Sequence, residues 1–368
     1  MDLTMRTADL ANELALIERV VPRRPTIPSL TCAHLTAHED GKVTLVGTDA
    51  RVGIVSRAGR ADVAVAGSSL VPAAKLSDLV RSLPGDAPIR LRSDGVSVRL
   101  TASGYVGVLQ TFDVQDFPAV PEPEVETLPR IIPSTTLLGL VRRTRYAISG
   151  HEDARGVITG ALLECDGTTA RVVATDGHRL SVAEAVVEEG AAYSSILSQL
   201  TIEALVAAFD EYDGPVEVCI GARHVFASGG ERTVFGQLIE GTFPAWRKIV
   251  PTYEVDIAMP RQALIDALRR ARLIADASRV ALRFGVEVDS LRVSAVSASV
   301  GSGDETIAAA YDGLPVEIGL NAGYVLDYLE AMSGDTVRVQ FKTKDSPFVM
   351  RSADGGSVCT GVVMPVRL

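Results

Sequence analysis

Cysteine, lysine and long apolar runs are scarce in this sequence of 368 residues. The four cysteines (Cys32, Cys165, Cys219 and Cys359) are far apart and form no C-x-x-C pair, which argues against a disulfide framework or a metal site. No apolar run is long enough to span a membrane, and the first residues show no basic region followed by an apolar core. We therefore expect a soluble, cytoplasmic protein without a metal or cofactor.

Positive charge is also limited. The formal net charge is −10 and the sequence pI is about 5.1. Proteins that coat DNA are usually basic, because neutralising phosphates supplies most of their non-specific affinity. Composition therefore argues mildly against a nucleic-acid partner, unless the basic residues gather on one surface and the acidic ones on another.

Familiar catalytic motifs are missing as well. The chain has no Gly-rich phosphate loop, no G-x-S-x-G and no H-E-x-x-H. Asp176 and His178 in ATDGHRLS could form an acid–base pair, which leaves a hydrolase as one alternative. Asp-Gly is ordinary turn chemistry, however, and the matching segment GTDARVG lacks the histidine. We predict that the protein is not an enzyme.

What the chain does have is a threefold internal repeat. Leu10, Leu14, Ile17 and Val21 have the spacing of one face of an amphipathic helix. The stripe recurs twice, each time 127 residues further on, as Leu137, Val141, Thr144 and Ile148 and then as Leu264, Leu268, Ala271 and Ala275. Ser134 and Pro260 precede the later copies, as helix-start residues often do.

A second helix and a strand recur in the same order. The apolar positions of this helix are Leu76, Leu79, Val80 and Leu83, then Ile202, Leu205, Val206 and Phe209, then Val325, Leu329 and Met332. Each copy runs into a Gly-containing turn and an alternating strand, in APIRLRSDG, GPVEVCIG and DTVRVQFK. TLVGTDARVGIV and RVVATDGHRLSV, and the two Phe-Pro pairs at 117 and 243, are further matches.

The repeats predict an α+β protein of three tandem domains, 1–123, 124–252 and 253–368. In each domain two helices pack on one side of antiparallel sheet. VPEPEVETLP and VPTYEVDIAMP have the character of linkers. Tandem domains form either an open array or part of a closed ring, and periodicity alone does not distinguish these.

Arginines occur in register on the first helix of the second and third repeats. Arg142, Arg143 and Arg145 occupy the same helical positions as Arg269, Arg270 and Arg272. A solvated helix face is the plain interpretation of one such cluster. Two clusters in register favour a shared basic surface that binds a phosphate backbone without regard to base sequence.

Five segments spread over the whole chain closely resemble one family. RPTIPSL, ATDGHRLS, FPAWRKIVP, NAGYVLDYLEAM and the terminal VVMPVRL are similar to segments of the bacterial DNA polymerase III beta subunit, the sliding clamp. The resemblance implies three tandem repeats of the DNA-clamp domain and a head-to-tail homodimeric ring, with helices lining the hole. Such a ring encircles double-stranded DNA independently of sequence and confers processivity. Its acidic remainder would face away from the duplex.

The resemblance also implies a groove for short peptide motifs with a Gln and a Leu-Phe-like end. The expected partners are the DNA polymerase III alpha subunit, the clamp loader, and other polymerases and repair proteins. We expect Ile158, Leu180, Val362, Met364 and Val366 to form an apolar pocket. The remaining matching positions are Thr175, Gly177, His178, Arg179, Pro244, Lys248, Ile249, Asn321, Tyr324, Ser346, Pro347, Pro365 and Arg367.

Two further sites follow from the resemblance. At the seam of the ring, Leu273 and Ile274 are expected to meet the strand around Val106, Val108 and Leu109 of the second copy. The predicted DNA-binding residues are Arg24, Lys75, Arg142, Arg143, Arg145, Arg155, Arg269, Arg270 and Arg272.

Some positions depart from the family pattern. Gly107 stands where a bulky seam residue is sometimes found, and Gly156 and Val157 replace an aromatic pair of some members. A specialised clamp that tolerates a groove-binding antibiotic would carry the same motifs. A repeat scaffold that binds proteins but not DNA is a further alternative.

Overall fold

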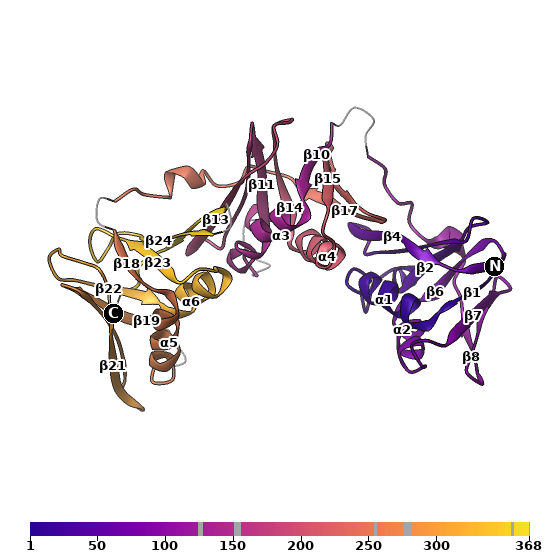
Figure 1. Ribbon diagram of the computed structural model, residues 1–368, viewed down its shortest axis with the longest axis horizontal. Coiled ribbons are helices and arrows are strands. Elements are labelled where there is room, and N and C mark those ends of the chain that lie inside the picture. Colours follow the sequence, from indigo (N-terminus) through magenta and orange to yellow (C-terminus); the bar gives the residue numbers. More distant parts are fainter. Residues whose placement is uncertain (124–127, 151–155, 254–255, 276–280, 355–356, 368) are drawn as a thin grey trace. The chain divides into compact units, whose positions relative to one another are not determined.

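The computed structural model describes residues 1–123, 128–150, 156–253, 256–275, 281–354 and 357–367. The chain forms two compact units (Figure 1). Unit 1 comprises Met1–Leu138 with Leu197–Leu238, and unit 2 comprises Gly139–Ile196 with Ile239–Leu368. The middle repeat therefore contributes residues to both units.

The helices confirm the repeat found in the sequence. The first helix of each repeat is α1 (Thr7–Ile17), α3 (Ser134–Arg142) and α5 (Arg261–Arg272). The second helix is α2 (Ala73–Arg81), α4 (Gln199–Phe209) and α6 (Ala322–Ala331). The apolar stripe faces the core, since the side chains of Leu10, Leu14 and Ile17 are fully buried.

The apolar stripe predicted from the sequence is longer than the helices that carry it. Helix α3 ends at Arg142, so Thr144 and Ile148 follow it and are not part of it. The Thr144 hydroxyl donates to the carbonyl oxygens of Leu140 (2.9 Å) and Val141 (3.2 Å), and a 3₁₀ turn comes next. A buried hydroxyl that bonds back to the preceding turn competes with helix continuation. The two predicted helix-start residues are confirmed, since α3 begins at Ser134 and Pro260 is the N-cap of α5. The Ser134 hydroxyl donates to the carbonyl oxygen of Tyr212 (2.5 Å).

Unit 1 contains two antiparallel sheets. One has the order β5-β1-β7-β8-β9, which leaves β9 at an edge. Its strands are β1 (Asp2–Arg6), β5 (Asp62–Val65), β7 (Pro88–Ser93), β8 (Ser97–Ala102) and β9 (Tyr105–Gln110). In the other, β6-β2-β3-β4 continues through β17, β16 and β15 to β10. These strands are β2 (Cys32–Ala37), β3 (Lys42–Thr48), β4 (Val52–Arg60), β6 (Gly67–Pro72), β10 (Arg130–Pro133), β15 (Pro215–Ile220), β16 (His224–Gly229) and β17 (Arg232–Ile239).

Unit 2 is built in the same way. A four-stranded sheet has the order β21-β20-β19-β22, with β21 at an edge. Its strands are β19 (Ala281–Glu287), β20 (Ser290–Ser297), β21 (Gly301–Ala308) and β22 (Val316–Asn321). A second sheet runs β18-β23-β24-β25-β13-β12-β11-β14. Its strands are β11 (Gly160–Asp166), β12 (Thr169–Thr175), β13 (Arg179–Val186), β14 (Tyr193–Ser198), β18 (Ile257–Pro260), β23 (Thr336–Gln340), β24 (Phe348–Asp354) and β25 (Ser357–Val363).

Strands from neighbouring repeats pair inside each unit. In unit 1, β4 of the first repeat pairs antiparallel with β17 of the second. In unit 2, β13 of the second repeat pairs antiparallel with β25 of the third. Short 3₁₀ turns lie at Pro28–Thr31, Val114–Asp116, Arg145–Ala147, Gly156–Ile158 and Trp246–Lys248. No described helix combines the length and apolar character that crossing a membrane requires.

Candidate functional site

The ATDGHR segment forms a tight turn between β12 and β13. The Thr175 hydroxyl donates to the carbonyl oxygen of Arg179 (2.6 Å) and accepts from the amide of Gly177 (3.1 Å). One Asp176 carboxylate oxygen accepts from the amides of His178 (2.9 Å) and Arg179 (3.0 Å). Gly177 has φ of 89°, which favours glycine. The carboxylate of Asp176 therefore holds the turn, and the His178 ring is exposed.

Arg179 connects this turn to helix α6. Its Nε donates to Asp176 (3.0 Å), its Nη2 donates to the carbonyl oxygen of Tyr146 (2.5 Å), and its Nη1 forms an ion pair with Asp327. The guanidinium carbon also lies 4.5 Å from the ring centre of Tyr324 and 5.2 Å from that of Tyr146. Burial raises the pKa of both phenols, so the rings are neutral near pH 7.

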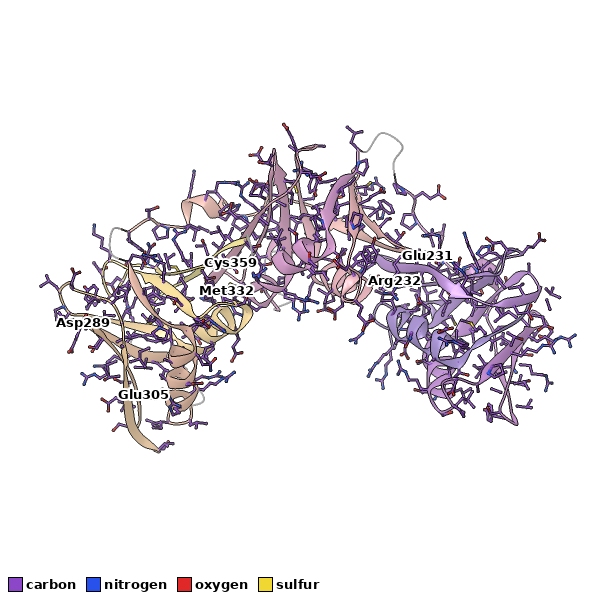
Figure 2. All side chains as sticks on the ribbon, in the orientation of Figure 1. Glu231, Arg232, Asp289, Glu305, Met332 and Cys359 are labelled. Atoms are coloured by element: carbon purple, nitrogen blue, oxygen red, sulfur yellow. The ribbon has the colours of Figure 1, made fainter. Side chains whose placement is uncertain are left out.

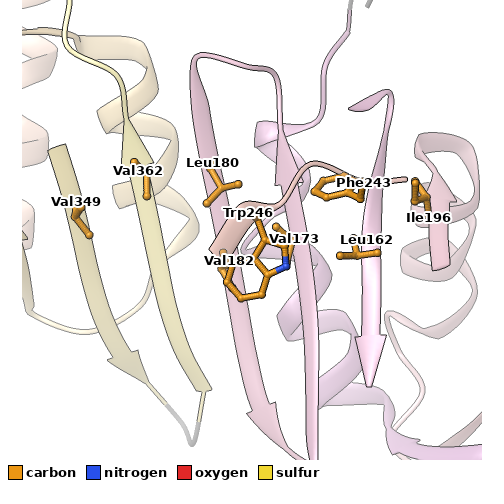
Figure 3. Close-up of a cluster of buried hydrophobic side chains, with 9 residues drawn as sticks. All are labelled: Leu162, Val173, Leu180, Val182, Ile196, Phe243, Trp246, Val349 and Val362. Carbon is orange, nitrogen blue, oxygen red and sulfur yellow. The ribbon is translucent and has the colours of Figure 1, made fainter. Parts of the chain in front are cut away.

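Beside the turn lies a buried apolar cluster, drawn in Figure 3. Its side chains come from β11, β12, β13, β14, β24 and β25, and from the segment that leads to the third repeat. The members are Leu162, Val173, Leu180, Val182, Ile196, Phe243, Trp246, Val349 and Val362. The partly buried Val157, Ile239, Val250 and Tyr253 pack against them. We call this set the Trp246 cluster.

The predicted pocket residues lie in and beside the Trp246 cluster. Leu180 and Val362 are core members, with 3% and 1% of their surface exposed. Met364 and Val366 follow β25 and remain 42% and 37% exposed. The amide of Met364 donates to the carbonyl oxygen of His178 (2.9 Å), which holds this terminal segment against the turn. Ile158 is half-buried in the Gly156–Ile158 turn.

Two more of the predicted polar residues have local partners. The Asn321 side chain caps α6 by accepting from the amide of Gly323 (2.9 Å). The Ser346 hydroxyl closes a turn by donating to the carbonyl oxygen of Thr343 (2.7 Å). Pro244, Pro347 and Pro365 are half-buried, and Lys248, Ile249 and Arg367 are exposed.

Two aromatic members of the cluster are not among the predicted groove residues. Phe243 and Trp246 belong to the segment FPAWRKIVP, whose predicted groove positions are Pro244, Lys248 and Ile249. The sequence signal that could have pointed to them is that the only tryptophan of the chain follows a Phe-Pro pair at the end of a repeat.

The cluster has a charged neighbour. Arg247 stacks on Trp246, with its guanidinium carbon 4.3 Å from the ring centre, and forms an ion pair with Glu164 (2.7 Å). A cavity of about 310 Å³ lies nearby, lined by Thr252, Tyr253, Ile257, Tyr311, Val316, Phe341 and Lys342.

The arginines of helix α5 have different partners. Arg269 pairs with Glu330 of α6 (2.8 Å), whereas Arg270 forms two hydrogen bonds with Glu305 of β21 (2.7 and 2.5 Å). Arg272 is exposed in the last turn. The neighbouring arginines of one helix therefore face different elements.

Four of the other predicted basic residues are exposed. In unit 2, Arg142 and Arg145 are exposed, and Arg143 is half-buried. In unit 1, Arg24 and Lys75 are exposed. Arg155 lies outside the described residues.

The predicted seam residues lie on or beside two sheet edges. On β9 in unit 1, Val106 and Val108 are 56% and 48% exposed, and Leu109 is half-buried. In unit 2, Leu273 is 81% exposed just after α5. Ile274 instead lies over Gly303 of β21.

Three family models match consecutive parts of the chain. They describe the N-terminal, central and C-terminal domains of the DNA polymerase III beta subunit, and they match residues 1–121, 131–245 and 247–367. Beta sliding clamps of Pseudomonas putida and Pseudomonas aeruginosa are 31% and 32% identical, over the full length of both chains. The beta sliding clamp of Escherichia coli K12 is 29% identical, again over both full lengths.

Solved structures agree with these relatives. The DNA polymerase sliding clamp of P. aeruginosa has a TM-score of 0.91, 30% identity and full coverage of both chains. A griselimycin-bound form of that clamp reaches 0.94 at the same identity and coverage. Three clamp domains of helices on antiparallel sheets, related by the repeat described above, account for all these matches. The chain therefore belongs to the bacterial DNA polymerase III beta subunit family and acts in DNA replication as a sliding clamp.

Proposed function

We propose that two copies of this chain form a head-to-tail ring around duplex DNA and hold replication and repair proteins there. The observation that carries the proposal is the Trp246 cluster, which is bordered by the exposed side chains of Met364 and Val366 beside the DGHR turn. We further propose the domain limits 1–123, 124–252 and 253–368, and a cytoplasmic location.

The groove is the best-supported part. A peptide with a hydrophobic end needs an apolar floor and a rim of polar groups that fixes its orientation. Leu180, Val362 and Trp246 supply a floor, while His178 and Lys248 are exposed polar side chains of the same unit. Each contact can be weak, because a partner tethered to the ring rebinds at an effective concentration on the order of millimolar.

DNA binding is supported by exposed basic residues on an acidic protein. Arg142, Arg145 and Arg272 belong to equivalent helices or follow them directly, and Arg24 and Lys75 are exposed in unit 1. Arg155 belongs to the proposed set by sequence alone. The contacts would be to phosphates and therefore insensitive to base sequence.

We also propose that the chain has no catalytic role of its own. The Asp176 carboxylate already accepts two amide hydrogens and one from Arg179, which leaves it poorly suited to act as the base of a hydrolase. The polymerase alpha subunit, the clamp loader and repair proteins would supply the enzymatic steps.

A griselimycin-like ligand is a candidate occupant of the groove, because a similar P. aeruginosa clamp has been crystallised bound to griselimycin. A titration followed by Trp246 fluorescence would detect its binding here. Saturable binding would support a drug-sensitive clamp. Failure to bind, while partner peptides still bind, would favour the specialised, antibiotic-tolerant alternative.

The decisive experiment is retention on nicked circular DNA, loaded with the cognate clamp loader and ATP. A closed ring stays on the circle and leaves once the circle is cut, since it can slide off the ends. Equal binding to circular and linear DNA would indicate ordinary electrostatic contact and contradict the ring. Absence of DNA binding together with intact peptide binding would favour the scaffold alternative.

A further inference from the structure

The cavity near the Trp246 cluster is lined by residues from both sheets of the third repeat. Ile257 belongs to β18 of one sheet and Val316 to β22 of the other, while Phe341 directly follows β23. Thr252 and Tyr253, from the segment that leads into the third repeat, complete this part of the lining. The volume of about 310 Å³ is at the lower end of the range for ligand sites.

The cavity has an apolar floor and a solvent-exposed rim. Ile257 and Phe341 are buried, with 0% and 5% of their surface exposed. Thr252 and Lys342 are exposed, and the other lining residues are half-buried. A ligand can therefore enter from solvent and still bury an apolar group against the core.

Tyr311 forms a fixed part of the wall. Its phenol donates to the carbonyl oxygen of Leu314 (2.6 Å), and its own carbonyl oxygen accepts from the amide of Asp289 (2.9 Å). Asp289, labelled in Figure 2, lies in the turn between β19 and β20. The next amide back, that of Ala310, donates to the carbonyl oxygen of Ala258 in β18 (2.9 Å). A wall held in place before binding lowers the entropic cost of binding.

Two of the lining positions have equivalents in the other repeats. Ile257 lies four residues before the first helix of its repeat, and Val316 lies six residues before the second helix. The same distances identify Leu3 and Gly67 in the first repeat, and Arg130 and Tyr193 in the second. The pairings of β1, β10 and β18 with the strands beside them agree with this alignment.

The other repeats place larger groups at these positions. In the second repeat they are occupied by Arg130 and Tyr193, and Arg130 is only 2% exposed. In the first repeat Met1 lies beside Gly67, since a Cβ atom on this glycine would be 3.5 Å from the Met1 nitrogen and 3.6 Å from its Cβ. The smaller Val316 leaves the space open in the third repeat. The cavity is therefore a property of this repeat and not of the domain fold.

The rim carries polar groups that the protein itself does not use. Among the described residues, the Lys342 ammonium forms no ion pair, and neither the Thr252 hydroxyl nor the Tyr253 phenol forms a hydrogen bond. Lys342 is also the only charged residue of the described lining. An anionic group would complement it. The rings of Tyr253, Tyr311 and Phe341 favour an aromatic ligand, which can pack edge-to-face or offset against them.

Tyr253 connects the cavity to the proposed groove. Its side chain packs against the Trp246 cluster and also lines the cavity. Phe341 adds a second connection, because its ring centre lies 5.7 Å from that of Phe348, the residue before the cluster member Val349. A peptide seated in the groove can therefore reach the cavity through a short extension of its chain.

We propose that the cavity binds an aromatic side chain of the partner peptide, followed by an acidic residue, outside the Gln-Leu-Phe-type motif. The ring packs against Tyr311 and Phe341, and the carboxylate meets the ammonium of Lys342. The proposal rests on the peptide groove proposed above and specifies which partner sequences bind it most tightly.

Peptides with a flexible extension test this site in the full chain. Each carries the Gln-Leu-Phe-type motif, a Gly-Ser spacer of two, four or six residues at either end, and a final Phe-Glu pair. A four-residue spacer spans roughly 11 Å on average, enough to pass one tyrosine side chain. The matched control peptides end in Ala-Gln. At least one Phe-Glu peptide should bind about tenfold more tightly than its control, because it buries one more aromatic side chain.

Variants of the protein locate the gain in affinity. Lys342→Glu reverses the charge at the rim and should reduce the gain about fivefold. Lys344→Glu makes the same change at an exposed residue outside the lining, and should leave the gain intact. Val316→Trp fills the cavity and should abolish the gain. The Kd of the unextended motif should change less than about twofold in all three variants, since none of these residues belongs to the Trp246 cluster.

The unextended motif distinguishes failure of the cavity from failure of the groove. If the motif binds but no Phe-Glu peptide exceeds its control, the cavity proposal is wrong and the groove stands. If the motif itself does not bind at millimolar concentration, the groove fails and the extension has no anchor, which overturns both. A gain that persists in both Lys342→Glu and Val316→Trp would place the extension elsewhere and overturn the cavity proposal alone.

Discussion

The guanidinium of Arg179 lies 4.5 Å above the ring of Tyr324 and joins strand β13 to helix α6. The same group bonds to Asp176 and to the carbonyl oxygen of Tyr146, and its side chain is only 11% exposed. One side chain therefore fixes the turn that carries His178 against the third repeat. The position of the proposed groove rim therefore depends on it.

We expect Arg179→Lys to destabilise unit 2. Lysine keeps the charge but loses the planar fork and the stacking, so the partners cannot all be satisfied. The free energy of unfolding should fall by about 2 kcal/mol, below the full cost of breaking a buried pair because Asp327 is 44% exposed. Urea unfolding followed by Trp246 fluorescence measures this. Arg283→Lys, on an exposed ion pair, is the control and should change stability by less than about 0.5 kcal/mol.

Truncating Met364 should weaken peptide binding without unfolding the protein. Its side chain is 42% exposed beside the Trp246 cluster, so Met364→Ala removes contact area for a ligand but little core. We expect a roughly tenfold higher Kd for a Gln-Leu-Phe-type peptide, corresponding to about 1.4 kcal/mol, and an unchanged Tm. Val186→Ala, at 79% exposure on β13, should leave the Kd unaltered. Equal effects of the two changes would argue against this groove.

The strand pair β4–β17 in unit 1 carries polar side chains where the equivalent pair β13–β25 in unit 2 carries apolar ones, and it should tolerate conversion to them. Arg232 and Ser56 both reach the buried carboxylate of Glu13. Arg232→Ala alone should cost about 3 kcal/mol, because it leaves that carboxylate without its counter-charge. The triple change Glu13→Leu, Ser56→Ala and Arg232→Cys introduces the residues found 127 positions later, Leu140, Ala183 and Cys359, and should restore most of the loss. Thermal unfolding compares the variants, and a triple variant less stable than Arg232→Ala would contradict the equivalence.

Lowering the pH should lower the free energy of unfolding of unit 1, because His34 is then protonated more readily in the unfolded chain. Burial lowers the pKa of His34 from its usual value of about 6.5, and within the described residues its Nε2 atom has no hydrogen-bond partner. Between the lowered pKa and 6.5 the unfolded chain binds a proton that the folded chain does not, so stability falls as the pH falls through this window. His34→Gln should flatten the dependence of Tm on pH between about 7.5 and 5.5. An unchanged slope would show that other groups cause it.

Periodicity predicted much of the fold. Leu10, Leu14 and Ile17 recur with a constant spacing, and each copy begins a helix that buries them. The same spacing predicted that the second copy of this helix includes Thr144, but α3 ends at Arg142. Apolar spacing does not reveal that the Thr144 hydroxyl donates to the carbonyl oxygen of Leu140. The family resemblance named Leu180 and Val362, yet neither it nor the spacing pointed to Trp246 as their neighbour.

The sequence by itself determined the repeat, its helices and the sharp Asp176-Gly177 turn, because these depend on local spacing and on residues close along the chain. Only the tertiary structure decided that Trp246 and Val362 belong to one buried cluster, and that β9 and β21 are edge strands among the described strands. It also decided that Arg269 binds Glu330 of helix α6 while Arg270 binds Glu305 of strand β21. Those facts depend on side chains brought together from segments far apart in the chain. No local pattern specifies such contacts, because the folded backbone alone brings these groups within reach of each other.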